Sequence, residues 1–236
     1  MQRNYTGRRL SFMNLNSIEN LGIERVLKRG TGEIIYRDND AILVRDKVSK
    51  AFLFACDDTK KGLSILDNHI KEDCNLLMLS DYELGKSAFK RYGFEDMIEC
   101  HQVAYYGEKP KEDAAISFRV AVTSDIDMLL ENYDMISSDE LTEVVERANI
   151  ILGFSDDILV GFVGEHLEGS MGILYVFPEY RNRGYATALE KHMIAVTMDK
   201  GFDPFGQVEK DNEASLNLQK KLGMVCSENL ITWMWK

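Results

Sequence analysis

The sequence predicts an α/β protein of the α+β type, in which a mixed β-sheet is flanked by helices. Three observations support this fold class. Apolar residues make up 45% of the 236 residues and charged residues 28%, a balance typical of a chain that buries a sizeable core. Segments with the two-residue period of strands alternate with segments of helical period. A charged stretch that contains Pro110 separates two such series, which indicates two halves.

The second half opens with a strand, because apolar residues alternate with polar or small ones from Ile116 to Val122. Thr123-Ser124-Asp125 is expected to cap a helix that runs through Leu130, and Ser137 to Glu140 forms a capping box before Leu141. Strands follow at 150–154 and 158–163, and the Ser155-Asp156-Asp157 segment between them predicts a hairpin.

The remaining elements are bounded by glycine and proline. A third strand at 172–177 ends at Pro178, and a helix at 185–200 ends at Gly201. The last three elements are a strand at 205–208, a helix from Asn212 to Gly223, and a strand at 230–235. The predicted order is β-α-α-β-β-β-α-β-α-β.

The first half repeats features of the second in the same order. Residues 52–62 parallel 174–184, and residues 87–94 parallel 217–224. Ordinary helix-capping chemistry also produces a Lys-x-Gly ending before a strand, so the match supports an internal duplication without requiring one. We expect a domain at 1–110 and a second at 115–236, with the boundary within 107–114.

Charge and composition exclude several functions. A net charge of −11 opposes binding to a phosphate backbone, so nucleic acid is not an expected partner. No apolar run approaches the roughly 18 residues of a membrane span, and Met1–Tyr5 lacks the apolar core of a secretory signal, so we expect a cytoplasmic protein without membrane contact. The four cysteines include no CxxC pair and lie apart from the histidines, so no metal site is expected.

The segment Arg181-Asn182-Arg183-Gly184-Tyr185-Ala186 follows a predicted strand and opens a predicted helix. A helix start presents unpaired backbone N–H groups, which are natural partners for phosphate oxygens. Gly184 permits close approach of the backbone, and the two arginines add charge-assisted hydrogen bonds. This pattern favours a pyrophosphate cradle, and a basic turn before a surface helix is the alternative. It is neither a P-loop nor a Rossmann fingerprint.

The segment 176–186 resembles the V-x-P-x-x-R/Q-x-x-G-x-G/A motif of the GNAT superfamily of acyl-CoA-dependent N-acyltransferases. Further residues fit that family's downstream pattern of a strand, an Asn-capped helix and a Leu-Gly-Phe-like ending: Val208, Asn212, Ser215, Leu218 and Lys221-Leu222-Gly223-Met224. The resemblance covers 115–236 and implies the GNAT fold. Two tandem GNAT-like halves, the first degenerate, are similar to the glycine N-acyltransferase-like members.

The resemblance also implies a set of cofactor-binding residues. The pyrophosphate of coenzyme A would be held by Arg181, Asn182, Arg183, Gly184, Tyr185, Ala186 and Thr187. The backbone of Leu174, Tyr175 and Val176 would pair with the pantetheine arm and polarise the thioester carbonyl. Asn212 would contact the cofactor arm and also serve as an N-cap, and Ser215 joins it on the same helix.

The resemblance implies transfer of an acetyl or other short acyl group from acyl-CoA to a primary amine of a small molecule or peptide, by direct attack in a ternary complex without a metal. The alternative is a non-catalytic acyl-CoA-binding or sensing protein. Gln219 stands where many family members have a tyrosine that acts as general acid, and glutamine does not release a proton at useful pH. Water or Tyr175 is the alternative donor.

Glu165 and His166 are the candidate general bases, and an ordered water chain is the alternative. Residues 59–64 of the first copy keep the glycine but lack both arginines, so the first half is expected to serve recognition or as a scaffold. Terminal strands of this fold class can pair between subunits, but nothing in 231–236 requires it.

Overall fold

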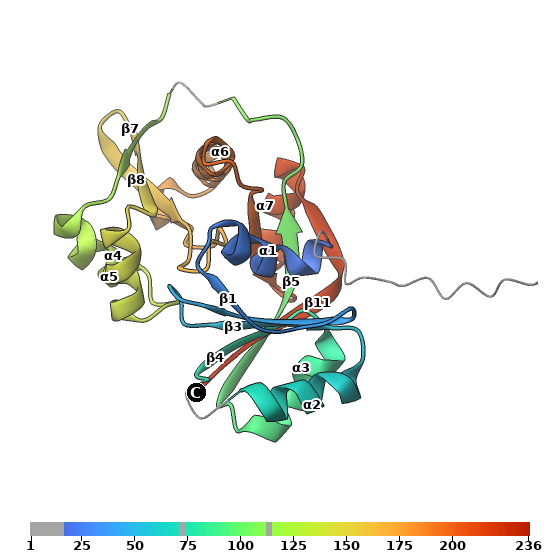
Figure 1. Cartoon of the computed structure of the whole chain (residues 1–236). Coiled ribbons are helices and arrows are strands. Elements are labelled where there is room, and N and C mark those ends of the chain that lie inside the picture. Colours follow the sequence, from blue (N-terminus) through green and yellow to red (C-terminus); the bar gives the residue numbers. More distant parts are fainter. Residues whose placement is uncertain (1–16, 71–73, 112–114) are drawn as a thin grey trace, which may run out of the picture. The chain divides into compact units, whose positions relative to one another are not determined.

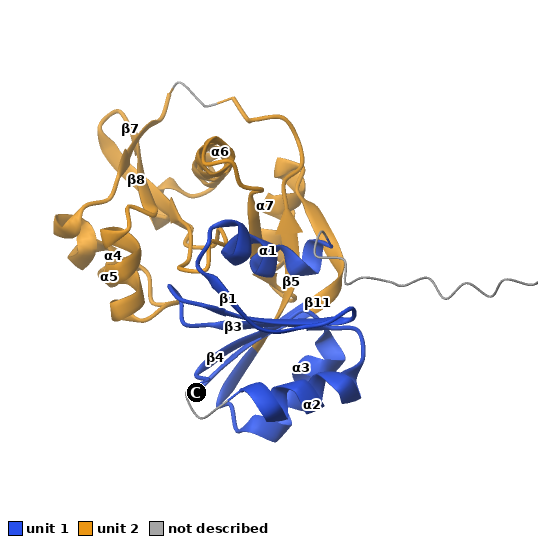
Figure 2. Ribbon diagram, in the orientation of Figure 1, with its two compact units in different colours: residues 1–97, 231–236 blue, residues 98–230 orange. Residues whose placement is uncertain are grey.

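The computed structural model describes residues 17–70, 74–111 and 115–236 (Figure 1). The predictions made for Met1–Tyr5 and for the last residues of the 107–114 boundary lie outside the described residues. Contacts divide the chain into two units, which Figure 2 colours separately: unit 1 comprises residues 1–97 and 231–236, and unit 2 comprises residues 98–230. The boundary expected at 107–114 therefore falls inside unit 2, and the chain passes between the units within two strands.

Unit 1 alternates strands with helices. Its elements are η1 (Ile18–Asn20), α1 (Leu21–Lys28), β1 (Gly32–Arg37), β2 (Ala41–Asp46), β3 (Phe52–Cys56), α2 (Thr59–His69), β4 (Leu76–Leu79), α3 (Tyr82–Tyr92) and the end of β11 (Val225–Trp235). The strands lie in the order β1-β2-β3-β4-β11, in which β3 and β4 are parallel and the other neighbours are antiparallel. Unit 1 therefore contains the mixed sheet that the fold class predicts.

Helices cover both faces of the unit 1 sheet. The helices α2 and α3 lie side by side on one face (Figure 1), where Phe52 and Phe54 of β3 belong to their apolar cluster. The alternate residue Leu53 points to the opposite face and lies against Gly22 of α1. Because β3 is covered on both sides, all five of its residues are buried, which explains its uninterrupted apolar sequence.

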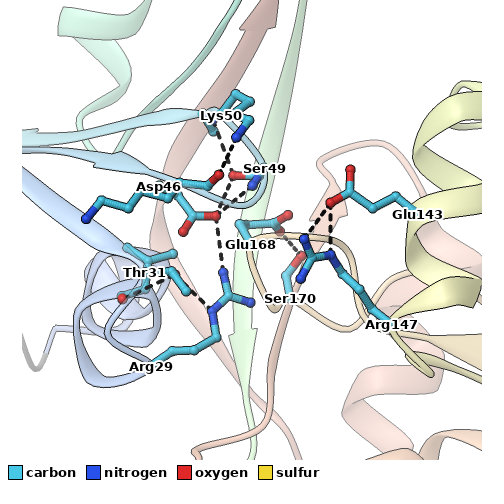
Figure 3. Close-up of polar contacts among 12 residues, drawn as sticks. Arg29, Thr31, Asp46, Ser49, Lys50, Glu143, Arg147, Glu168 and Ser170 are labelled. Atoms are coloured by element: carbon cyan, nitrogen blue, oxygen red, sulfur yellow. Dashed lines mark hydrogen bonds and ion pairs between the residues drawn. The ribbon is translucent and has the colours of Figure 1, made fainter.

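A buried carboxylate ties the end of β2 to the segment after α1 (Figure 3). Asp46 is fully buried, and its Oδ2 accepts hydrogen bonds from Arg29 Nη2 at 3.1 Å and Ser49 Oγ at 2.8 Å. Burial raises the pKa of Asp46, but hydrogen bonds from Thr31 and Ser49, together with Arg29, outweigh burial and lower it. Asp46 is thus a buried anion that is stabilised by its hydrogen bonds and by the charge of Arg29 within unit 1.

Unit 2 confirms the order of elements expected for the second half. Its elements are β5 (Asp96–Ala104), β6 (Ser117–Val120), η2 (Thr123–Asp125), α4 (Ile126–Asn132), α5 (Ser138–Glu146), β7 (Ile150–Ser155), β8 (Ile158–Gly164), β9 (Tyr175–Val176), η3 (Pro178–Tyr180), α6 (Tyr185–Asp199), β10 (Phe205–Glu209), α7 (Glu213–Leu222) and the start of β11. From β6 onwards the strands and α-helices follow the predicted sequence. The main difference is the third strand, which covers Tyr175–Val176 rather than 172–177.

Unit 2 holds two groups of strands. One group is antiparallel and runs in the order β6-β7-β8-β9, and the other runs in the order β11-β5-β10. The helix α6 packs on β8 and β9, and its Leu189 and Met193 share an apolar cluster with Val176. Leu216 of α7 shares a second apolar cluster with Val208 of β10. The helices α6 and α7 therefore cover two neighbouring edge strands, β9 and β10.

The turn residues behave as their sequence predicts. Asp156 and Asp157 both have positive φ, at 49° and 63°, which is the conformation of a tight hairpin turn between β7 and β8. Ser137 Oγ accepts a hydrogen bond from the Glu140 backbone N–H at 3.1 Å and caps α5. Only this half of the predicted capping box is formed, because the Glu140 carboxylate lies beside His166.

Candidate functional site

The segment between η3 and α6 forms a loop with two residues in the left-handed region. Asn182 has φ of 62° and Gly184, the N-cap residue of α6, has φ of 91°. A Cβ at position 184 would meet no atom within 4 Å, so this side of the loop is open. The loop therefore brings the first N–H groups of α6 to an accessible position, as the sequence predicts.

The start of α6 differs from the starts of four other helices. The helices α2, α3, α5 and α7 are each capped by a side chain that accepts a backbone hydrogen bond, and the capping residues are Asp58, Asp81, Ser137 and Asn212. No side chain caps α6, and its first turn carries no acidic residue. The N–H groups and positive dipole end of this 15-residue helix are thus left for an external anion.

Two arginines flank this helix start. The guanidinium of Arg181 lies 5.6 Å from the centroid of the Tyr175 ring, and that of Arg183 lies 5.7 Å from the centroid of the Tyr180 ring. Arg181 Nε donates to the Val176 carbonyl at 3.0 Å, which leaves its terminal nitrogens for an anion. Both side chains are exposed and are positioned by aromatic rings, which suits charge-assisted hydrogen bonds to phosphate oxygens.

The strands β9 and β10 part beside this loop. Met171 and Gly206 form a single parallel bridge, in which Met171 N–H donates to the Phe205 carbonyl at 2.7 Å. A Cβ at position 206 would lie 2.4 Å from the Met171 carbonyl oxygen, so the close approach requires glycine. Beyond the bridge, within the described part of the chain, β9 pairs with β8 alone and β10 with β5 alone. We call this divergence the fork.

One backbone donor of β9 faces the fork. Phe177 N–H donates to the Val160 carbonyl of β8 at 3.1 Å, so the backbone N–H and carbonyl of Phe177 point towards β8. Backbone groups of successive strand residues point to opposite edges, so the N–H and carbonyl of Val176 face the fork. The bond from Arg181 to that carbonyl agrees with this direction. The Val176 N–H is consequently a backbone donor at the open edge of β9.

Asn212 and Ser215 lie in the first turn of α7, directly after β10. Asn212 Oδ1 accepts a hydrogen bond from the Ser215 backbone N–H at 3.1 Å, so its N-cap role is confirmed. The predicted contact of these two residues with a cofactor arm stays a prediction.

The side chains of the two candidate bases contact different residues in the structure. Glu165 is 4% exposed, and its carboxylate accepts hydrogen bonds from Thr197 Oγ1 at 2.9 Å and Lys200 Nζ at 3.0 Å, both from the far end of α6. His166 Nδ1 lies 3.4 Å from Glu140 Oε1 of α5. Glu165 is therefore engaged in holding α6, and the two side chains do not form one site.

The environment of His166 is acidic. Burial lowers the pKa of His166, but the hydrogen bond to Glu140 and the charges of Glu168 and Glu140 outweigh it, so the pKa lies above its ordinary value. Ser170 Oγ hydrogen-bonds Glu168 and holds that carboxylate in place (Figure 3). His166 Nε2 lies 2.6 Å from the position of a Cβ at Gly172, the residue that follows the bridge at the fork. Both candidate bases lie close to the fork in the chain, since Glu165 forms a bridge with Met171. Only the His166 ring contacts Gly172, whereas the Glu165 carboxylate is held by Thr197 and Lys200.

The sequence prediction missed Glu190. This residue of α6 is 4% exposed, and its Oε1 accepts a hydrogen bond at 3.1 Å from Nε2 of Gln219, which lies on α7 and is 7% exposed. Burial raises the pKa of Glu190 to about 7, and the hydrogen bond from Gln219 offsets only part of that effect. The sequence feature that could have indicated a buried Glu190 was its helical spacing, because position 190 lies on the same buried side of the helix as Ala186 and Met193.

The corresponding loop of unit 1 lacks these properties. Asp58 caps α2 by accepting a hydrogen bond from the Lys61 backbone N–H at 2.7 Å, whereas no side chain caps α6. Lys61 Nζ pairs with Asp38 at 2.8 Å and with Asp40 at 3.1 Å. The helix start and its lysine are therefore both satisfied within unit 1.

The described residues contain neither a cluster of metal ligands nor a membrane-spanning helix. No group of three or more His, Cys, Asp or Glu side chains has the arrangement of a metal site in residues 17–70, 74–111 and 115–236. Within the same residues, no helix has both the length and the apolar character needed to cross a membrane.

Comparison with known proteins supports the fold. The model of the acetyltransferase (GNAT) family matches residues 120–224, so this segment of the chain is similar to that family. The residues matched include the 181–187 loop, the fork and both helices of the Glu190–Gln219 contact. The fold is accordingly a mixed α/β fold of the GNAT type. No curated protein matches the chain.

Solved structures share this fold at low sequence identity. A Drosophila protein is 16% identical with a TM-score of 0.63, over 83% of this chain and 73% of that one. A putative GNAT-family acetyltransferase from Novosphingobium aromaticivorans is 16% identical with a TM-score of 0.58, over 93% and 97% of the two chains. A GCN5-related N-acetyltransferase-like protein from Streptococcus suis is 15% identical with a TM-score of 0.56, over 91% and 92%.

Proposed function

We propose that unit 2 binds acyl-CoA through the 181–187 loop and transfers the acyl group to a primary amine of a small molecule or peptide. The observation that carries this proposal is the uncapped start of α6, flanked by two exposed arginines and lying beside the fork. A diphosphate needs several N–H donors and positive charge at one place, which this loop provides. The family match at 120–224 supports acyl transfer from acyl-CoA as the class of reaction.

The residues present fit coenzyme A in two respects. The N–H groups of Tyr185, Ala186 and Thr187 and the guanidinium groups of Arg181 and Arg183 would hold the diphosphate. The open edges of β9 and β10 would accept the amide-containing arm, with Leu174, Tyr175 and Val176 along one side and Asn212 and Ser215 along the other. When bound, acyl-CoA supplies the acyl group as a thioester, from acetyl-CoA or another short acyl-CoA.

Each remaining step is assigned to a group of this chain. The Val176 N–H would donate to the carbonyl oxygen on which negative charge develops, a contribution worth about 3 kcal/mol in well-placed sites. His166 is the better-placed base, because its ring lies beside the fork while Glu165 is held by Lys200 and Thr197. His166 accepts a proton only in its neutral form, so its raised pKa moves this activity to higher pH. Direct attack by the amine then needs no covalent enzyme intermediate.

We further propose that unit 1 serves recognition or as a scaffold and does not bind coenzyme A. The internal pairing of Lys61 and the cap formed by Asp58 support this assignment. Unit 1 also repeats the strand-helix-strand-helix order of β9, α6, β10 and α7 in its own β3, α2, β4 and α3, which supports the duplication inferred from the sequence.

The test compares Arg183→Ala with Lys60→Ala, which alters an exposed cation in the first turn of α2 in unit 1. Coenzyme A binding is measured by calorimetry, and thiol release from acetyl-CoA is measured with glycine, spermidine, an aminoglycoside and a peptide amine. We expect Arg183→Ala to weaken binding by about 10-fold or more, through the loss of a charge-assisted hydrogen bond, without reordering the preferred amines.

Lys60→Ala should match the wild-type protein in both measurements. An unchanged affinity in Arg183→Ala would contradict the assignment of the loop. Binding without thiol release on any amine would favour the acyl-CoA sensor over the enzyme.

A further inference from the structure

The Glu190–Gln219 contact lies between the two helices that cover the fork. Glu190 follows Leu189, which shares an apolar cluster with Val176 of β9. Gln219 lies one helical turn from Leu216, which shares an apolar cluster with Val208 of β10. The Glu190–Gln219 hydrogen bond thus joins the helix that covers β9 to the helix that packs on β10.

The contact leaves two buried polar atoms without a partner in the described residues: Glu190 Oε2 and Gln219 Oε1. Gln219 Nε2 donates to Glu190 Oε1, which assigns that oxygen the role of acceptor. When Glu190 is protonated, its proton therefore belongs on Oε2, the oxygen without a partner. A buried O–H with no acceptor is costly, and an acceptor that arrives with a ligand would remove that cost.

The protonation of Glu190 depends on burial rather than on neighbouring charge. Burial raises the pKa of Glu190 to about 7, and the hydrogen bond from Gln219 opposes that rise. The charged or titratable neighbours along α6, Lys191 and His192, and those on α7, Lys220 and Lys221, do not contribute. Near neutral pH a substantial fraction of Glu190 is thus in the acid form, which a solvated glutamic acid would not be.

We propose that Glu190 is the proton donor to the leaving thiolate of the acyl transfer, with Gln219 as the positioning residue that fixes the orientation of its carboxyl group. This inference rests on the proposed function. As the amine nitrogen bonds to the carbonyl carbon, the C–S bond breaks and its electron pair goes to sulfur. Glu190 Oε2 gives its proton to that sulfur, which forms the free thiol of coenzyme A.

The atoms balance over one turnover. The amine nitrogen loses one proton to the base or to solvent, and the carboxylate of Glu190 takes one proton from solvent before the next turn. Glu190 thereby supplies the proton that Gln219, at the usual tyrosine position of the family, cannot supply.

The test uses Glu190→Gln, which keeps the shape and the hydrogen bond to Gln219 but has no acidic proton, with Glu228→Gln on an exposed site of β11 as the matched control. Coenzyme A affinity is measured by calorimetry for all three proteins. Transfer rates are measured from pH 5.5 to 9 with two substrates. The first is acetyl-CoA. The second is an acetyl thioester of an analogue of coenzyme A in which an aromatic, strongly acidic thiol replaces the alkyl thiol.

We expect Glu190→Gln to bind coenzyme A like the wild-type protein and to transfer from acetyl-CoA about 100-fold more slowly. The wild-type rate should fall above about pH 7 as Glu190 loses its proton, and this decline should be absent in Glu190→Gln. The aromatic thioester should react at similar rates in both, because its thiolate leaves without a proton. Glu228→Gln should match the wild-type protein throughout.

Two results would overturn the inference: wild-type rates in Glu190→Gln, or equal losses with both thioesters, since a merely structural role would slow both alike. Failure of the proposed function is seen separately, as an absence of coenzyme A binding or of transfer in the wild-type protein itself.

Discussion

Replacing Gly184 by valine is expected to weaken coenzyme A binding by about 100-fold or more. Two effects combine. Position 184 has φ of 91°, which is strained for a β-branched residue by roughly 1–3 kcal/mol, so the loop should move away from its present conformation. A side chain there would also occupy the open side of the loop, where phosphate oxygens must approach the N–H groups of α6. Calorimetric titration with coenzyme A measures the loss.

The matched control is Gly201→Val at the opposite end of the same helix. Gly201 has φ of 80°, and a Cβ there would also meet no atom within 4 Å, so the backbone strain is comparable. Both variants should lower the melting temperature to a similar extent, and only Gly184→Val should lose coenzyme A affinity. Equal affinities in the two variants would show that the helix start does not bind the diphosphate.

Removing the backbone N–H of Val176 is the second change with a large expected effect. Incorporation of the α-hydroxy analogue of valine replaces the amide by an ester, which deletes the donor and keeps the side chain. If this N–H stabilises the charge that develops on the thioester oxygen, kcat should fall about 100- to 1,000-fold, while coenzyme A affinity changes little. The measurement is kcat with a saturating amine acceptor.

The same ester at Phe177 is the control, because that N–H donates to the Val160 carbonyl of β8 and not into the fork. It removes one hydrogen bond from the same short strand and should lower stability without a comparable loss of kcat. A fall of equal size at 176 and 177 would assign the effect to damage in β9 rather than to the loss of a fork donor.

The order of elements in the second half was predictable because the residues at the ends of its helices and strands carry local signals. Gly201 and Gly223 both end helices in the left-handed conformation, with φ of 80° and 79°, and only glycine adopts it without strain. The hairpin at Asp156 and Asp157 follows from the same local chemistry. The shortness of β9 was not predictable, because the apolar run at 172–177 is continuous and pairing depends on a distant strand.

The position of the 181–187 loop at a helix start was predictable from its own residues, since a glycine and two arginines before a helical run are a local pattern, and its binding of phosphate stays a prediction. The fork was not, because the single bridge between Met171 and Gly206 joins residues 35 positions apart. The role of Glu165 also required the structure, because its partners Thr197 and Lys200 lie at the far end of α6. Glu190 was missed because the contact that holds it comes from another helix.

The proposed function depends most on the interaction between a diphosphate and the start of α6. Its most direct test is calorimetric titration of the wild-type protein with coenzyme A and, separately, with pantetheine, which has the same arm but no diphosphate. We expect saturable binding of coenzyme A at least about 100-fold tighter than that of pantetheine. A folded protein that binds neither, or that binds both equally, would contradict the central claim.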